Sequence, residues 1–270
     1  MDKKKYDLKT DNKFVISGSC SYLLKKEYST LLTGRNLTFE VTPLSLEEAL
    51  LFKRITIDKK NLKNNLLLDT TKTKILKTLD SLLEQGSFPE VFLKQKKFKS
   101  LILKQYFDDI LYKDILGRYN FNSQKTKDLV LYLITNITNI FFLMKIRNSV
   151  HLSYYTAEDY LVAYKEAYLL FTLEKFSYSL KQQKKAPSKI YCIDNGLRNA
   201  VSFKYSTDAG KLAENLVFIE LIRRDKETYY WKGQNEVDFV VKNSDNSLEA
   251  INVCYSNEIH PQRIKRSYRV

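Results

Sequence analysis

The sequence has little glycine, cysteine and histidine, and each scarcity excludes a kind of site. The 270 residues include seven glycines, and no two are five positions apart, as a Walker A phosphate loop requires, or two apart, as a dinucleotide-binding loop requires. The three cysteines, Cys20, Cys192 and Cys254, form no C-x-x-C pair, and His151 and His260 lie 109 positions apart. We therefore expect no metal site and no disulfide, as in a protein of the reducing cytoplasm.

Long apolar runs are also missing. The N-terminal residues Met1–Tyr6 are charged and no apolar stretch follows them, which argues against a signal peptide. The most apolar segment, Leu129–Met144, is interrupted by polar residues and predicts a buried core helix, not a membrane span. A cytoplasmic protein without a membrane partner is the expectation.

Basic charge is plentiful, with 45 lysines and arginines, 31 acidic residues and a formal net charge of +14. A basic surface attracts nucleic acid through counterion release. Lysine, however, makes up 35 of the 45 basic residues, in a chain also rich in asparagine, isoleucine and tyrosine, as an AT-rich genome would encode. The charge is therefore compatible with nucleic-acid binding and with compositional drift alike.

The first part of the chain reads as a strand, a helix and a loop, followed by a second helix. The apolar run at 14–16 predicts a buried strand, and residues 21–32 predict a helix that Thr33-Gly34 ends. A second helix is expected over 43–52, because Ser45 and Glu48 have the spacing of a capping box. Residues 56–70 are rich in lysine and asparagine and predict a loop.

The middle of the chain, about 70–145, is helical by pattern, with a break at Gly86–Pro89 and a further amphipathic helix over 153–168. Two short alternating segments follow, at 169–173 and 175–179. Helices followed by two strands is the order of a winged helix-turn-helix. After Pro187 the pattern changes to a strand at 189–193, a helix at 210–224 and strands near 228–231, 237–241 and 248–253, which predict a separate α/β unit.

Several collinear motifs resemble one family over nearly the whole chain. The N-terminal motifs are Phe14–Ser19, Thr33-Gly34-Arg35 and Pro43-Leu44-Ser45. The middle motifs are Gly86–Glu90, Tyr106–Ile110 and Asp114-Ile115, and the C-terminal ones are Lys189–Leu197, Glu214–Phe218, Tyr230-Trp231 and Glu236–Phe239. Together they resemble uncharacterised archaeal and bacterial ATP-binding proteins of the AAA superfamily, which have a winged-helix segment and a nuclease-like C-terminal domain.

In that family the Walker A and Walker B motifs precede the strand that corresponds to residue 14, and only 13 residues precede it here. We therefore expect a truncated or partial member, from a split, decayed or shortened gene, that lacks the ATP and Mg²⁺ bound by its full-length relatives. The resemblance implies nucleotide-sensor roles for Ser17, Ser19 and Arg35. Without a phosphate loop these positions have nothing to sense, and we expect a turn and a surface arginine with no ATP hydrolysis by this chain alone.

The resemblance also implies positions of a PD-(D/E)XK nuclease, in which two acids share Mg²⁺ and a lysine assists the attacking water. Glu214 on a helix and Asp238 in a strand match that pattern. The second acid position falls on Asn252 and the lysine position on Cys254, and neither residue supplies the required chemistry. We expect the nuclease-like fold to survive without an active metal site.

Two kinds of surface remain as partner sites. The helix at 155–168 carries Glu158, Asp159, Lys165 and Glu166, an acidic face that favours contact with protein over DNA. The basic residues gather elsewhere, and a phosphate contact would use these positions: Lys94, Lys96, Lys97, Lys99, Lys104, Arg263 and Arg266.

The sequence therefore predicts a mixed α/β and α chain of three parts. Residues 1–55 form the remnant of an AAA core, 56–185 a helical linker with a winged-helix-like domain, and 186–270 a degenerate nuclease-like α/β domain. The expected function is a non-catalytic interaction module that binds a full-length ATPase relative or another protein through the helical middle. The alternatives are a nucleic-acid-binding module that uses its lysine-rich surfaces and, third, a metal-dependent nuclease.

Overall fold

The computed structural model describes residues 15, 17–21, 37–57, 69–144, 152–202 and 209–255. The described α-helices are α2 (Leu46–Phe52), α4 (Asp69–Gln85), α5 (Pro89–Leu93), α6 (Lys96–Asp109), α7 (Ser123–Thr135), α9 (Tyr154–Glu166), α10 (Leu180–Lys185), α11 (Asn195–Val201) and α12 (Ala209–Arg223). A π-helix, η3 (Ile110–Leu116), continues α6. The strands are β1 (Ile140–Phe141), β2 (Leu170–Leu173), β3 (Ser188–Cys192), β4 (Glu227–Lys232), β5 (Glu236–Lys242) and β6 (Leu248–Ile251). The fold is mixed α/β, as the sequence predicted.

The helix boundaries follow local sequence signals. Ser45 caps α2 by accepting from the Glu48 backbone, while the Glu48 carboxylate accepts from the Ser45 backbone, so the predicted capping box is confirmed. Helix α4 ends before Gly86, which has a φ of +84°. That conformation suits glycine, and it places the chain against the Asp194 carboxylate, where any side chain would collide.

The first sheet has the strand order β1-β3-β2 and is antiparallel throughout. The segment 129–144 is not one helix: α7 ends at Thr135 and the chain turns through Thr138, with a φ of +66°, into β1. The expectation of a strand at 175–179 was also wrong. There Lys175 forms only an isolated bridge with Tyr230, and the strand that pairs with β2 is β3.

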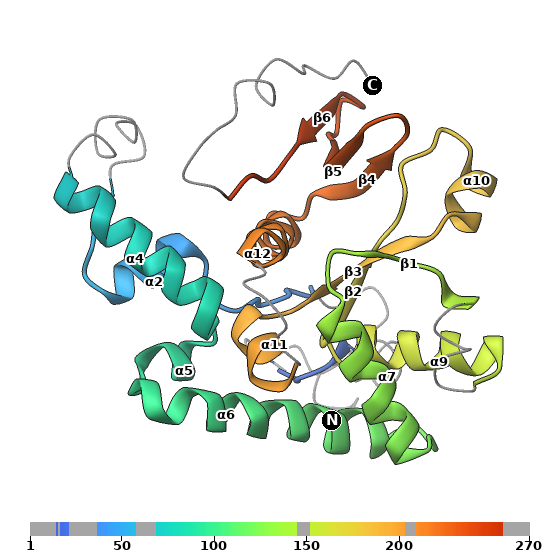
Figure 1. The fold of residues 1–270 in the computed structure, drawn as a ribbon, viewed down its shortest axis with the longest axis horizontal. Helices are drawn as coiled ribbons and strands as arrows, with labels where there is room; N and C mark the ends of the chain where they lie inside the picture. The colour runs from blue at the N-terminus through green and yellow to red at the C-terminus, as the bar shows by residue number, and fades with distance from the viewer. Residues whose placement is uncertain are drawn as a thin grey trace, which may run out of the picture.

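Strand β3 is therefore the central strand of a sheet whose other members come from the middle of the chain. The boundary predicted at residue 186 separates β3 from its two sheet partners. The second sheet, β4-β5-β6, is an antiparallel meander with a register shift between Tyr229 and Trp231. In Figure 1, α12 lies between the two sheets and α6 runs along the opposite side of the molecule.

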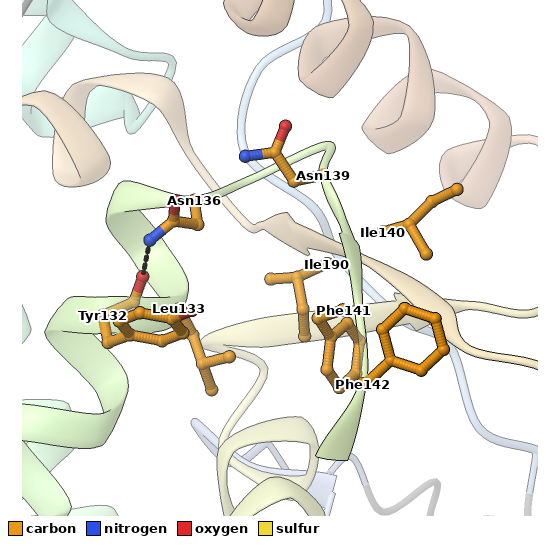
Figure 2. A pocket seen from close by; sticks show the side chains of 8 residues that line it. All are labelled: Tyr132, Leu133, Asn136, Asn139, Ile140, Phe141, Phe142 and Ile190. Atoms are coloured by element: carbon orange, nitrogen blue, oxygen red, sulfur yellow. Dashed lines mark hydrogen bonds between the residues drawn. The ribbon is translucent and has the colours of Figure 1, made fainter. Parts of the chain in front are cut away.

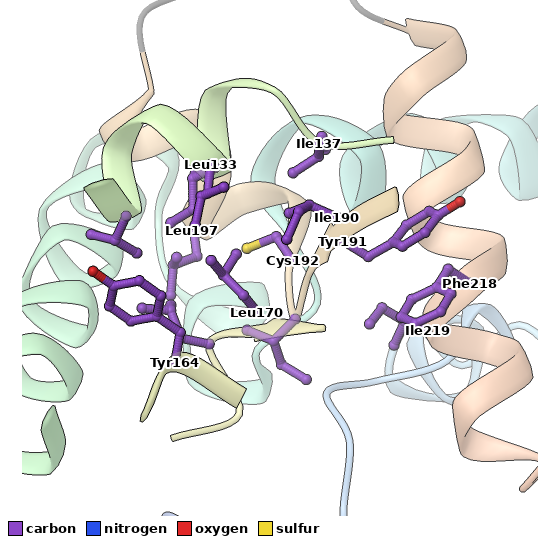
Figure 3. Packing of buried hydrophobic residues seen from close by; sticks show 14 of the residues in the cluster. Leu133, Ile137, Tyr164, Leu170, Ile190, Tyr191, Cys192, Leu197, Phe218 and Ile219 are labelled. Carbon is purple, nitrogen blue, oxygen red and sulfur yellow. The ribbon is translucent and has the colours of Figure 1, made fainter. Parts of the chain in front are cut away.

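One continuous core joins the helical part to both sheets. Figure 3 shows Ile190, Tyr191 and Cys192 of β3 between Leu133 and Tyr164 on one side and Phe218 of α12 on the other. Tyr191 stacks on Phe218 with ring centroids 4.0 Å apart. Because β3 contributes side chains to both neighbours, it is the element through which the helical part and the C-terminal sheet are held together.

Most of the predicted AAA remnant lies outside the described residues. This applies to Phe14 and Ile16 of the expected strand, to residues 22–36 with Arg35, to 58–68, and to the C-terminal residues 256–270. Within the described residues, no helix is both long enough and apolar enough to cross a membrane.

Candidate functional site

A buried lysine surrounded by carboxylates lies where the two sheets meet. The Nζ of Lys189 is 3.0 Å from Glu214 Oε1, 3.0 Å from Glu236 Oε1 and 3.7 Å from Asp238 Oδ1. Its side chain is 2% exposed, against 13% for Glu214, 21% for Asp238 and 42% for Glu236. We call these four residues the Lys189 cluster.

Three elements bring the cluster together. Lys189 is the second residue of β3, Glu214 lies on α12, and Glu236 and Asp238 lie two residues apart on β5 and therefore on one face of that strand. The Tyr191 hydroxyl donates to Glu214 Oε1 over 2.8 Å, and the Lys189 ammonium lies 5.8 Å from the centre of the Tyr230 ring. The cluster thus links the first sheet, α12 and the second sheet through charge-assisted contacts.

Charge and burial oppose one another in this cluster. Burial alone would lower the pKa of Lys189, but the charges of Glu214 and Glu236 and their hydrogen bonds outweigh it and raise that pKa. Burial raises the pKa of Glu214 despite the opposing effect of Lys189. Burial also acts to raise the pKa of the more exposed Glu236, but the hydrogen bonds and charges of Lys189 and Lys232 prevail and lower it. Lys189 is therefore a permanently charged ammonium at neutral pH.

This arrangement does not suit the chemistry of a metal-dependent nuclease. A protonated lysine has no lone pair for nucleophilic or base catalysis, and its ammonium lies among the carboxylates that would have to ligate a cation. Among the described residues, no group of three or more His, Cys, Asp or Glu side chains could hold a metal ion. The residues present do not fit Mg²⁺, and we derive no hydrolytic step from them.

Contacts around β5 connect three of the four predicted nuclease positions. Glu214 and Asp238 belong to the Lys189 cluster. The Asp238 backbone donates to Asn252 Oδ1 over 3.0 Å, and the Val253 backbone donates to Asp238 Oδ2 over 2.8 Å. Asn252 thus fixes the strand that carries Asp238, and Cys254 is exposed two residues further on. The sequence reasoning missed Lys189 and Glu236, although a lysine at the start of an apolar strand was a signal that it would be buried with a partner.

The predicted nucleotide-sensor residues make fewer contacts than the residues of the Lys189 cluster. Ser17 and Ser19 are both exposed, and Ser19 Oγ donates to Asp114 Oδ1 of η3 over 3.2 Å. Asp114 also pairs with Arg118 at 3.5 Å. Arg35 lies outside the described residues.

The predicted phosphate-contacting lysines have different surroundings. Lys99 is 9% exposed and donates to Gln85 Oε1 over 2.8 Å and to the Phe92 carbonyl over 3.3 Å. Burial, followed by the charge of Lys53, lowers its pKa. Lys94 pairs with Glu90 at 3.8 Å. The remaining lysines of this run, Lys96, Lys97 and Lys104, are exposed, and Arg263 and Arg266 lie outside the described residues.

Two of the motifs that carried the resemblance meet in the core. Asp194 caps α11 by accepting from the Leu197 backbone over 2.8 Å, and its other oxygen accepts from both the backbone and the hydroxyl of Ser87. A side chain at Gly196 would collide with the backbone carbonyl of Gln85. The Gly86–Glu90 and Lys189–Leu197 motifs therefore fix α4 against α11, which is a structural role.

A shallow pocket of about 220 Å³ lies beside the edge strand β1. Figure 2 shows Tyr132 and Leu133 of α7, with Asn136 just after the helix, facing Phe141 and Ile190 across it. Asn136 Nδ2 donates to the Tyr132 carbonyl over 2.8 Å, so one of the polar groups is already engaged within its own helix. The lining residues include Tyr132 but no Asp, Glu, His, Cys, Lys or Arg, so the pocket offers few of the groups that a reaction site uses.

Comparisons with known proteins agree with parts of the resemblance. Residues 3–50 match the model of an AAA domain, 76–208 the domain of unknown function DUF8612, and 209–269 the domain of unknown function DUF4143. An uncharacterised protein of Methanocaldococcus jannaschii is 36% identical over 266 residues, and one of Haemophilus influenzae is 30% identical over 241. No solved structure matches.

The alignments cover 94% and 87% of this chain but 58% and 57% of the two relatives, so the chain spans somewhat more than half the length of the curated relatives it matches. Over the matched ranges the chain is similar to an AAA domain, to two domains of unknown function and to these two uncharacterised proteins.

Proposed function

We propose that this chain is a non-catalytic interaction module that docks onto the nucleotide-binding core of an AAA-like ATPase. Its 270 residues contain no phosphate-loop glycine pair, and a lysine closes the carboxylate cluster at the nuclease-like positions. The groups essential for ATP hydrolysis and for metal-dependent nucleic-acid cleavage are therefore not found within this sequence. The proposal instead rests on one segment of the surface that exposes apolar side chains.

Residues 37–42 expose three apolar side chains in alternation. Leu37 is 86% exposed, Phe39 80% and Val41 94%, with polar Thr38 and Glu40 between them. Alternation of this kind is the pattern of a strand that has one face covered by a sheet or a helix. Covering each of these side chains would contribute about 1.5–3 kcal/mol, so a partner with an apolar face gains by binding here.

The segment is fixed in place at its middle and at its end. The Tyr168 hydroxyl donates to Glu40 over 2.9 Å, Arg223 donates to the Pro43 carbonyl, and the Leu44 backbone donates to the Ser87 carbonyl over 2.8 Å. These contacts hold the segment against the helical body while its apolar side chains face outward. A segment that is already held in position loses less conformational entropy on binding than a free one.

The occupant we infer is an α/β ATPase core, because the segment lies within residues 3–50, which match an AAA domain. The two relatives are longer than the matched region by more than two fifths of their length, which leaves room for such a core in their chains. A core of the kind that the AAA model describes is the partner that best fits the segment.

The middle of the chain supports a winged-helix domain as part of this module. The order α7-β1-α9-β2-β3, in which helices accompany a small antiparallel sheet of order β1-β3-β2, is compatible with this proposal. The exposed positions of α9 include Tyr155 at 78% and Val162 at 44% beside Glu158 and Asp159. An apolar and acidic face of this kind suits a protein partner better than a DNA groove.

The experiment that tests the proposal is site-specific photo-crosslinking. Phe39 is replaced by a benzoylphenylalanine in the full chain, which is irradiated in extract of its source organism, and the adduct is identified by mass spectrometry. We expect an adduct with a protein that carries a G-x₄-G-K-[S/T] loop. The same crosslinker at Leu101, which is 67% exposed on α6, serves as the matched control and should not give this adduct.

The outcome also separates the alternatives. An adduct only with a second copy of this chain, or the same adducts at residues 39 and 101, would contradict the proposal. As a further check, the Phe39→Ser and Val41→Ser double variant should lose the adduct formed from a crosslinker at Leu37, because the apolar contact is removed while the segment's anchors at Glu40 and Pro43 remain.

A further inference from the structure

The segment that joins β2 to β3 begins with Glu174, carries only basic charges beyond it, and projects from the first sheet. Residues 175–188 contain Lys175, Lys181, Lys184 and Lys185 and no acidic residue. In Figure 1 the segment extends away from the body with α10 at its outer end. The lysines of α10 do not belong to either basic run that the sequence reasoning singled out, so they form a separate surface.

Three of these lysines share one face of α10. Lys181, Lys184 and Lys185 are related by spacings of three and four residues, which places neighbouring side chains about 5–6 Å apart at Cβ. All three are exposed, and within the described part of the chain none forms a salt bridge with a carboxylate. Their charge is therefore directed to solvent, unlike that of Lys189, Lys94 or Lys113, each of which has an acidic partner.

The base of the segment is rigid although its outer end is solvated. Phe176 is 6% exposed and packs edge-on against Tyr229 and Tyr178, with ring centroids 5.7 and 5.1 Å away. The Phe176 backbone donates to the Tyr230 carbonyl over 2.7 Å, and Gln183 Nε2 donates to Glu174 over 2.7 Å. The three ammonium groups are thus held on a scaffold and do not sit at the end of a free loop.

From this arrangement we propose that α10 and its flanking residues bind the phosphate backbone of duplex nucleic acid without reading its sequence. A duplex carries one negative charge per ~1.7 Å of axis, twice the density of a single strand, and a compact group of three lysines gains most from the denser array. Tyr178, 84% exposed beside the lysines, adds a hydroxyl that can donate to a phosphate or sugar oxygen. The acidic face of α9 keeps that helix out of the groove, so the contact is with the backbone alone.

The test measures the salt dependence of binding to a labelled duplex by fluorescence anisotropy. Three phosphate contacts give a slope of log K against log salt of about −2.7, or a loss of ~40-fold between 50 and 200 mM salt. The triple variant Lys181→Gln, Lys184→Gln, Lys185→Gln should lose about that much slope. The matched control Lys96→Gln, Lys97→Gln, Lys104→Gln removes the same charge from exposed positions of α6 and should retain the slope.

Every other result overturns the inference. Equal loss of slope in both triple variants would show that binding responds only to the net charge of the chain. The absence of binding at 50 mM salt would show that α10 does not bind duplex nucleic acid. Tighter binding to a single strand of the same length, or to anionic vesicles, would assign the lysines to another partner. Circular dichroism of both variants checks that α10 and α6 remain folded. The test is independent of Phe39 and of the proposed ATPase partner.

Discussion

The Lys189 cluster and the segment at 37–42 differ in whether their side chains find partners within the chain. In the cluster, a buried ammonium group is paired with three carboxylates of the same chain, which are exposed to different degrees. In the segment, apolar groups are exposed and only the polar Glu40 between them is bonded to the body. The charged groups of the first region are paired within the chain, whereas the apolar side chains of the second are left uncovered. A site whose charged groups are all paired within the chain favours a structural role, and a segment with uncovered apolar side chains favours binding.

The largest effect is expected from removing the lysine that closes the cluster. Lys189→Met leaves three carboxylates without their shared cation and should lower the free energy of unfolding by about 3–5 kcal/mol in urea denaturation. Lys232→Met is the control, because Lys232 contacts Glu236 from a half-exposed position and should cost less than about 1 kcal/mol. Similar values for the two variants would mean that the cluster is as solvated as the surface.

A smaller loss is expected at the glycine that joins two helices of the core. Gly196→Ala drives a methyl group into the backbone carbonyl of Gln85 and should destabilise by about 1–3 kcal/mol. Gly210→Ala is matched to it, since nothing lies within 4 Å of that position and its helix α12 favours alanine. Gly210→Ala should leave stability unchanged or raise it, and a comparable loss at both positions would contradict the close approach of α4 and α11.

The pH dependence of stability distinguishes two of the three carboxylates of the cluster, those of Glu236 and Glu214. The pKa of Glu236 is lowered in the folded chain, so its contribution is present above the unfolded pKa and is lost as pH falls through the folded one. The stability difference between Glu236→Gln and the wild type should therefore be largest near neutral pH and vanish in acid. Glu214, whose pKa is raised, should show the opposite sign of pH dependence in the variant Glu214→Gln. A constant difference across the range would show that neither group titrates differently on folding.

The smallest effect on stability is expected in the exposed segment. The Phe39→Ser and Val41→Ser double variant removes apolar side chains that are 80% and 94% exposed, so the free energy of unfolding should stay within about 0.5 kcal/mol of the wild type. Thermal unfolding of the isolated chain checks this. A loss of several kcal/mol would show that the segment packs against this chain and not against a partner.

The sequence predicted local features well and long-range partnerships poorly. Ser45 with Glu48 and the glycine break after α4 were readable because a cap and a turn depend on a few adjacent residues. The strand pairing was not, because β3 reads like any apolar strand, and whether it joins β1 and β2 or the later strands depends on contacts distant in the sequence.

The candidate site shows the same division. Glu214 and Asp238 were identified through a resemblance, and the replacement of the usual acid and lysine by Asn252 and Cys254 was visible in the sequence. The lysine that completes the cluster lies 25 residues before Glu214 and on a different sheet from Asp238. No spacing rule links those positions, because the contact depends on how β3 packs against α12.

The most direct test of a closed cluster is a Mn²⁺ titration followed by electron paramagnetic resonance. We predict that the wild-type chain and Asp238→Asn give the same weak, unsaturated binding at millimolar metal, because the Lys189 ammonium lies among the carboxylates that would ligate the ion. Saturable binding of one Mn²⁺ to the wild type, lost in Asp238→Asn, would contradict the account and restore a metal site at the nuclease-like positions.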